Sequence, residues 1–197
     1  MTVSPSFEDI VAIHEAGHLV AAHKLRVPFS GPNVITIIPS EEYSGRFTHK
    51  NIFAFTDGVF RDDDHSRLKM ERIVQAALAG IEAQRYLDPA SIRCGESYGD
   101  WDGGDDYHQA IDLTDRFTSG NEESEAYLEL LRIRAQNLVR SPVNWACIDA
   151  IATSLVQSKT LSAPQALRII QQTVTDLVPR RPDQPVVGRS DLADSDC

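Results

Sequence analysis

Apolar residues recur every three to four positions over most of the chain, the spacing that gathers them on one face of a helix. Helix start and stop signals bound several of these runs, such as Ser6 before the first run and Pro89 after the second. We therefore expect helices at about 6–27, 66–87, from 105 or 106 onwards, 122–139, 142–157 and 162–178.

Residues 33–50 break this helical pattern. The stretch NVITIIP (33–39) is rich in β-branched residues and stops at a proline, which is typical of a strand. RFTHK (46–50) alternates in polarity and follows the turn-like EEYSG, so it predicts a return strand. The predicted fold class is therefore mainly α (α+β), a helical domain with a small β-hairpin.

Two segments lack any periodicity. The stretch RRPDQPVVGRSDLADSDC at the end has no apolar spacing that could build a core, so we expect a disordered tail over 179–197. The polar stretch 52–65 predicts a loop. With 197 residues and no internal repeat, the chain is expected to form one domain over 1–178.

Composition narrows the classes of partner and compartment. The chain has 19 basic and 29 acidic residues, a net charge of −10, so its surface repels phosphate backbones and anionic lipid and we expect no nucleic-acid partner. The start, MTVSPSFEDI, lacks the basic and apolar regions of a signal peptide, and we expect no membrane span. Three scattered cysteines without a CxxC pair fit a reducing compartment, so we expect a cytoplasmic protein.

The strongest chemical signal is IVAIHEAGHLVAA, residues 10–22, which contains the pattern HExxH. His14 and His18 are four residues apart and lie on one helical face, where both rings can reach one metal ion. Glu15 projects about 100° away from His14, beside the metal, where it can take a proton from an attacking water. The pattern predicts a zinc site with Glu15 as the catalytic base.

A metal-free core helix is the alternative explanation for this stretch. HExxH arises by chance in roughly one sequence in a hundred of this composition, and a lone core histidine is usually just hydrogen-bonded. Apolar neighbours oppose the alternative, because burying two imidazoles and a carboxylate without partners costs several kcal/mol. Gly17 costs about 1 kcal/mol relative to alanine inside a helix, which indicates a close backbone or metal-side approach.

A zinc site of this kind requires a third protein ligand and an open position. Lys24 stands where the longer HExxHxxGxxH pattern has its third histidine, which excludes that class. The segment 94–115 lacks Lys and Arg, although a solvated acidic loop would explain its composition equally well. Spacing alone does not choose among its candidate carboxylates, which are Glu96, Asp100, Asp102, Asp105, Asp106, Asp112 and Asp115.

Successive stretches of the chain resemble the peptidase domain of FtsH-type membrane AAA proteases. They are IVAIHEAGHLVAA, NVITIIPSEEYSGRFTH, RIVQAALAGIEAQRYL, GGDDYHQAIDLT and WACIDAIATSLVQSKTLSAPQALRII, over roughly residues 7–171. The resemblance implies a mostly helical zinc peptidase with a small sheet and with an Asp as third ligand, which aligns with Asp106, four residues before Ala110. Asp106 would also lie in the first turn of its helix, where free N–H groups favour a carboxylate. Asp105 is the rival and would cap the same helix.

The chain also departs from that family. It contains no GxxxxGK[ST] phosphate loop, no ATPase module and no membrane anchor, so we expect no use of ATP. The acidic pair of the family's second helix reads Gln84-Arg85 here, and the small-residue run before the ligand reads WDGGD (101–105). These changes keep the ligand set and argue against processive proteolysis.

We therefore expect an ATP-independent zinc metallopeptidase, with one zinc per chain, that hydrolyses flexible or unfolded polypeptides and can form a homo-oligomer. The substrate would add as a strand to the edge of the 34–50 hairpin, with His108 or Tyr43 as candidate oxyanion donors. Two alternatives stay open. One is an adaptor or regulatory protein that binds zinc without turnover, and the other is a helical structural domain without metal.

Overall fold

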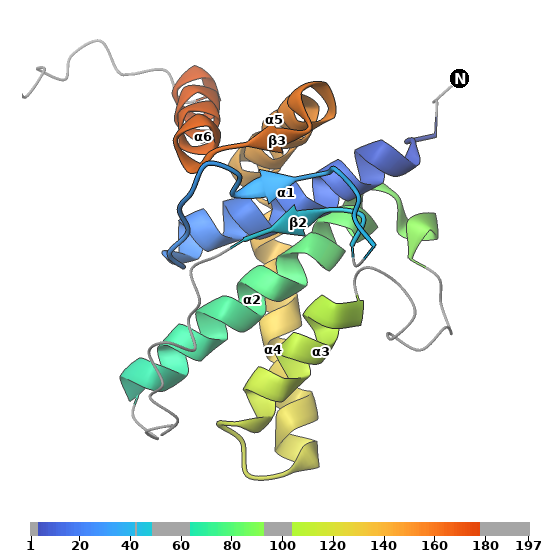
Figure 1. Cartoon of the computed structure of the whole chain (residues 1–197). Helices are drawn as coiled ribbons and strands as arrows, with labels where there is room; N and C mark the ends of the chain where they lie inside the picture. The colour runs from blue at the N-terminus through green and yellow to red at the C-terminus, as the bar shows by residue number, and fades with distance from the viewer. Residues whose placement is uncertain (1–3, 42, 49–63, 93–103, 178–197) are drawn as a thin grey trace, which may run out of the picture.

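The computed structural model describes residues 4–41, 43–48, 64–92 and 104–177, and these are mostly helical. The α-helices are α1 (Phe7–Leu25), α2 (Asp64–Leu87), α3 (Gly104–Asp115), α4 (Asn121–Arg140), α5 (Pro142–Ser158) and α6 (Ala163–Leu177), and a 3-10 turn, η2, covers Pro89–Ser91. A small sheet lies across α1, with α5 and α6 on one side of it and α2, α3 and α4 on the other (Figure 1). The prediction of a mainly α fold with a small sheet is confirmed.

Helix α1 begins and ends for local reasons that the sequence contains. Ser6 caps the helix as expected, since its Oγ accepts the Asp9 N–H at 3.2 Å and the Asp9 carboxylate accepts the Ser6 N–H at 2.9 Å. The helix ends at Leu25, two residues before the predicted end. Arg26 adopts a left-handed conformation with φ of 59°, and its N–H bonds back to carbonyls of the last turn.

The sheet has three short antiparallel strands, β1 (Ile35–Thr36), β2 (Arg46–Phe47) and β3 (Thr160–Leu161), in the order β2-β1-β3. Ile35 pairs with Phe47 on one side and with Leu161 on the other. The predicted hairpin is therefore present, but each strand has two residues instead of the five to seven expected. Strand β3 was not predicted, because two residues between two helices carry no alternating pattern.

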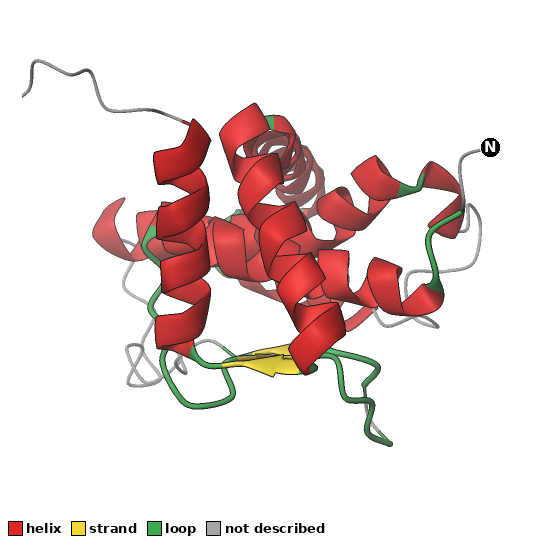
Figure 2. Cartoon of the chain, turned by 90° about the horizontal axis from the view of Figure 1, so that it is seen from above, coloured by secondary structure: helices red, strands yellow, loops and turns green. Residues whose placement is uncertain are grey.

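The core forms where α1 packs against α2 and α5. Figure 1 shows α1 and α2 crossing, and Figure 2 shows the sheet to one side of the packed helices. Residues 11–22 of α1 are buried around the whole helix, which is why its apolar positions form no single stripe. Gly17 lies at the crossing with α2. A Cβ there would stand 2.7 Å from the carbonyl oxygen of Ala79 and 2.8 Å from the Cβ of Ala83. The close approach expected at Gly17 is thus an approach of helix backbones.

The other helix boundaries differ from the prediction by at most two residues. Helix α2 begins at Asp64, so the end of the predicted 52–65 loop is helical. The remainder of that loop and the 179–197 tail lie outside the described residues. The buried residues of α2 extend beyond one helical face, because α1, α3 and α4 all pack on this helix. Within the described part of the chain, no helix combines the length and the apolar character needed to cross a membrane.

Candidate metal centre

Helix α1 presents His14 and His18 one turn apart on the same face. Both residues are 6% exposed, and their rings meet edge to face with centroids 4.7 Å apart. The two Nε2 atoms are 3.0 Å apart. The predicted convergence of these two nitrogens on one point is therefore observed.

Asp106 reaches the same point from the first turn of α3. Its Oδ2 lies 3.1 Å from Nε2 of His14 and 3.0 Å from Nε2 of His18. Its side chain keeps 27% of its exposure, so the cluster reaches solvent at this carboxylate. Within the described residues, His14, His18 and Asp106 form the group whose ligand atoms lie close enough to hold a metal ion.

The other candidate carboxylates of 94–115 do not join this group where they are described. Asp115 accepts a hydrogen bond from Ser124 Oγ at the far end of α3, and Asp112 is exposed. Glu96, Asp100, Asp102 and the side chain of Asp105 lie outside the described residues.

Each histidine ring is held through its other nitrogen, which fixes the tautomer. His18 Nδ1 lies 2.8 Å from the Ala76 carbonyl oxygen, which can only accept, so Nδ1 carries the proton. His14 Nδ1 lies 3.1 Å from Oε1 of Gln84, an acceptor as well. In the neutral rings both Nε2 atoms therefore carry an unprotonated lone pair, and both face the Asp106 carboxylate oxygen. Such a cluster of three acceptors requires a shared cation, either protons or a metal ion.

Charge and burial compete in setting the pKa values. Burial lowers the pKa of His18, but the Asp106 carboxylate, with smaller contributions from Glu15 and the Ala76 carbonyl, outweighs burial and raises the pKa of His18 to about 9. Burial raises the pKa of Asp106, but the two histidines outweigh it and hold the pKa of this carboxyl well below its ordinary range. In the absence of metal, these opposite shifts favour a partly buried ion pair between His18 and Asp106.

Glu15 lies beside the three candidate ligands and is 6% exposed. Burial raises the pKa of Glu15, and the two histidines oppose this shift. The backbone N–H of Phe47 in β2 donates a hydrogen bond to the Glu15 carboxylate. Gly45 makes this contact possible, because a Cβ there would stand 2.9 Å from Oε1 of Glu15 and 2.6 Å from a methyl group of Val11.

Helix α2 supplies contacts that the sequence did not reveal. Ala76, Gly80 and Gln84 are one turn apart on the face that meets the histidines. A Cβ at Gly80 would stand 2.3 Å from Nε2 of His18, so only glycine leaves room for this ring. The one available signal was the Gln84-Arg85 departure from the family pattern. Gln84 turns toward His14, whereas Arg85 pairs with the buried Glu82.

The two residues suggested as oxyanion donors occupy other surroundings. His108 is exposed on α3. Tyr43 lies under the guanidinium of Arg46, 5.5 Å from the ring centroid, in a hollow of about 470 Å³ on the outer side of the sheet. Their role stays a prediction.

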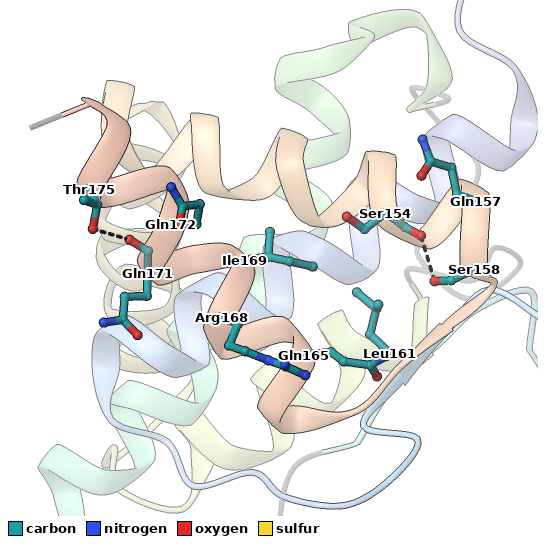
Figure 3. A pocket seen from close by; sticks show the side chains of 10 residues that line it. All are labelled: Ser154, Gln157, Ser158, Leu161, Gln165, Arg168, Ile169, Gln171, Gln172 and Thr175. Atoms are coloured by element: carbon teal, nitrogen blue, oxygen red, sulfur yellow. Dashed lines mark hydrogen bonds between the residues drawn. The ribbon is translucent and has the colours of Figure 1, made fainter.

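A larger hollow of about 730 Å³ lies between α5 and α6 and contains no residue of the metal cluster. Figure 3 shows polar side chains around it, with Leu161 and Ile169 between the two helices. Its lining is dominated by glutamines and hydroxyl groups, with Arg168 as the charged residue. This composition does not resemble the acidic and imidazole chemistry of the metal cluster.

In comparisons with known proteins, no family model matches the chain, and no curated protein matches it.

Proposed function

We propose that this protein is an ATP-independent zinc metallopeptidase that cleaves flexible or unfolded polypeptides. The observation that carries the proposal is the convergence of His14, His18 and Asp106 beside the buried carboxylate of Glu15. Two imidazoles and one carboxylate form a ligand set found in catalytic zinc sites, which keep a fourth position open. The exposed side of Asp106 is where that position would meet solvent.

The choice of zinc depends on Glu15. Two histidines and one carboxylate also bind iron in some oxygenases, so the ligand set alone fits two metals. A buried carboxylate directly beside the ligands adds a proton acceptor, which hydrolysis requires and oxygen chemistry does not. Metal analysis of the purified protein distinguishes the two, with about one zinc per chain expected and stoichiometric iron as the contrary result.

Glu15 would act as the general base in hydrolysis. Its pKa is raised by burial, which makes its carboxylate a better proton acceptor near neutral pH. Its hydrogen bond from the Phe47 N–H fixes its direction. Zinc bound by the three ligands would lower the pKa of the attacking water and polarise the scissile carbonyl. Glu15 would take the water proton and then deliver it to the leaving amine.

The position of β2 supports an extended substrate, because β2 is an outer strand of the sheet that the described residues form. Directly after β2, the Thr48 N–H donates to the carbonyl oxygen of Val34, directly before β1, at 2.8 Å. The Phe47 N–H donates to Glu15, so β2 runs beside the metal cluster. A polypeptide that adds to the edge as a strand would bring a peptide bond next to the base. Only flexible or unfolded segments can adopt that conformation.

A peptide-library cleavage assay on zinc-loaded protein tests the proposal. We expect cleavage that stops when a strong chelator removes the metal and returns when zinc is added. A protein that holds zinc and cleaves no peptide would instead be the zinc-binding adaptor considered above. The intact Glu15 argues against that outcome, since an inert metal site needs no buried base.

A further inference from the structure

We propose that Gln84 is a positioning residue of this metal centre, which holds His14 in the metal-binding tautomer through a neutral acceptor. The inference rests on the proposed function, because it requires a metal on His14. Gln84 itself touches neither the metal position nor a substrate. It acts through the ring of His14.

The hydrogen bonds around Gln84 fix which way its amide faces. Ser91 Oγ donates to the carbonyl oxygen of Asp88 at 2.6 Å, because a carbonyl can only accept. Ser91 Oγ is then free to accept from Gln84 Nε2 at 3.2 Å. The amide oxygen of Gln84 must face His14, and His14 Nδ1 must donate to it. The chain of bonds leaves His14 Nε2 without a proton, ready for a metal.

Burial makes this arrangement rigid. Gln84 is 1% exposed, so neither end of its amide can exchange its partner for water without opening the interface of α1 and α2. Ser91 belongs to η2, which directly follows α2, so the anchor of the amide lies close in the sequence. The ring of His14 is thereby oriented from a helix that contributes no ligand.

The neutrality of the amide also matters. A carboxylate at position 84 would be a third buried negative group around the histidines, with Glu15 and Asp106. It would draw the Nδ1 proton more strongly and make Nε2 of His14 a stronger ligand. The added negative charge would also disfavour ionisation of the Glu15 carboxyl group. Gln84 orients the ring as a carboxylate would, without that charge.

The experiment measures zinc affinity by competition with a chromophoric chelator. Gln84→Leu should lose 10- to 100-fold in affinity, the range found when such supporting hydrogen bonds are removed. Gln84→Glu restores an acceptor and should bind zinc at least as tightly as the wild type. With cobalt in place of zinc, Gln84→Glu should shift the visible absorption bands, because the ligand strength of His14 changes.

Gln75→Leu is the matched control. Gln75 is another buried glutamine of α2, 8% exposed, whose amide donates to the Glu71 carbonyl and not to the site. This variant should bind zinc as the wild type does, although it loses a similar buried hydrogen bond. A purely structural effect of removing a buried amide would lower affinity in both leucine variants.

Two results would overturn the inference. One is a zinc affinity of Gln84→Leu equal to that of the wild type. The other is an equal loss of zinc affinity in Gln84→Glu and Gln84→Leu. If Gln84→Leu does not fold by circular dichroism, Ser91→Ala decides instead, since it releases the amide without removing it and should weaken zinc binding several-fold. A wild-type protein that binds no zinc refutes the proposed function itself and is recognised before any variant is compared.

Discussion

The carboxylate of Glu15 is surrounded by two histidines, a backbone N–H and the chain around Gly45. None of these contacts makes it a ligand of the three-residue cluster. Because Glu15 lies beside the candidate ligands and is not one of them, its proposed role in proton transfer is separate from metal binding. At the scale of single residues, metal binding and proton transfer should therefore be separable by mutation.

Glu15→Gln tests this separation, because the amide keeps the size of the side chain and loses its basicity. The variant should hold zinc and keep its fold, while peptide hydrolysis falls by at least about 100-fold, as for loss of a general base. Zinc content and initial cleavage rates check it. Cleavage at the wild-type rate would show that Glu15 has only a structural role.

The pair of His18 and Asp106 predicts a pH dependence with a definite sign. The pKa of His18 rises from its ordinary 6.5 to about 9 in the folded, metal-free protein. Protonation of His18 therefore stabilises the fold fully below pH 6.5, and this contribution is lost as the pH rises through 9. Urea unfolding of metal-free protein should show a midpoint that falls between pH 7 and 9.

Zinc affinity should rise over the same pH interval, because fewer protons compete with the metal for the His18 ring. A His18→Gln variant should lack the stability trend, and a flat wild-type profile would contradict the ion pair.

At the scale of elements, the site combines helices that are distant in the sequence. Helix α1 provides two candidate ligands and the proposed base, α3 provides the third candidate ligand, and α2 holds both rings through Gln84 and the Ala76 carbonyl. The geometry therefore depends on how closely α1 and α2 pack, as well as on the ligands.

Asp106→Ala should abolish tight zinc binding, because two histidines alone leave the site one ligand short. Asp112→Ala is the control on the same helix, since Asp112 is exposed and lies away from the cluster. Zinc titration of both variants checks the assignment. Tight binding in Asp106→Ala would mean that another of the seven carboxylates is the ligand.

Gly17→Ala tests the packing of α1 on α2. The added Cβ would meet the Ala79 carbonyl at 2.7 Å, so the helices must separate, at a cost of about 1–3 kcal/mol. The gain in helix propensity of about 1 kcal/mol offsets part of this cost, so we expect a net loss of stability of up to about 2 kcal/mol. Gly120→Ala is a control in open space, expected to change stability by about 0.5 kcal/mol. Urea unfolding measures the stability of both variants. If Gly17→Ala is as stable as Gly120→Ala, the crossing of α1 and α2 can accommodate the added Cβ.

At the scale of the whole molecule, a metal bound by His14, His18 and Asp106 would link α1 to α3, which are far apart in the sequence. Because the unfolded chain has no preformed site, metal binding stabilises the folded state. A strong chelator should therefore lower the melting temperature by several degrees, and added zinc should restore it. Asp106→Ala should show no response to the chelator. An unchanged melting curve of the wild type would argue for the metal-free structural domain.

Features that depend on neighbouring residues in the sequence could be predicted, whereas features that depend on tertiary contacts could not be predicted from spacing. His14, Glu15 and His18 follow from spacing along one helix, and capping by Ser6 is equally local. Asp106 required the family resemblance, because a ligand from a distant helix has no spacing rule. The role of Gln84 depends on which way an amide faces, and this is set by tertiary contacts.

Short elements were predicted least well. Strand β3 has two residues, and what makes it a strand is its pairing with β1 from the other end of the chain. The early start of α2 and the shortness of β1 and β2 have a similar origin, since packing and not local preference sets such boundaries.

The pairing of β1 with β3 also means that the sheet cannot be completed early in synthesis on the ribosome. All three candidate metal ligands have been made when Asp106 emerges, but the central strand of the sheet still lacks one neighbour until Leu161 follows. The sheet that supports the backbone beside Glu15 is therefore completed only after every candidate ligand has left the ribosome.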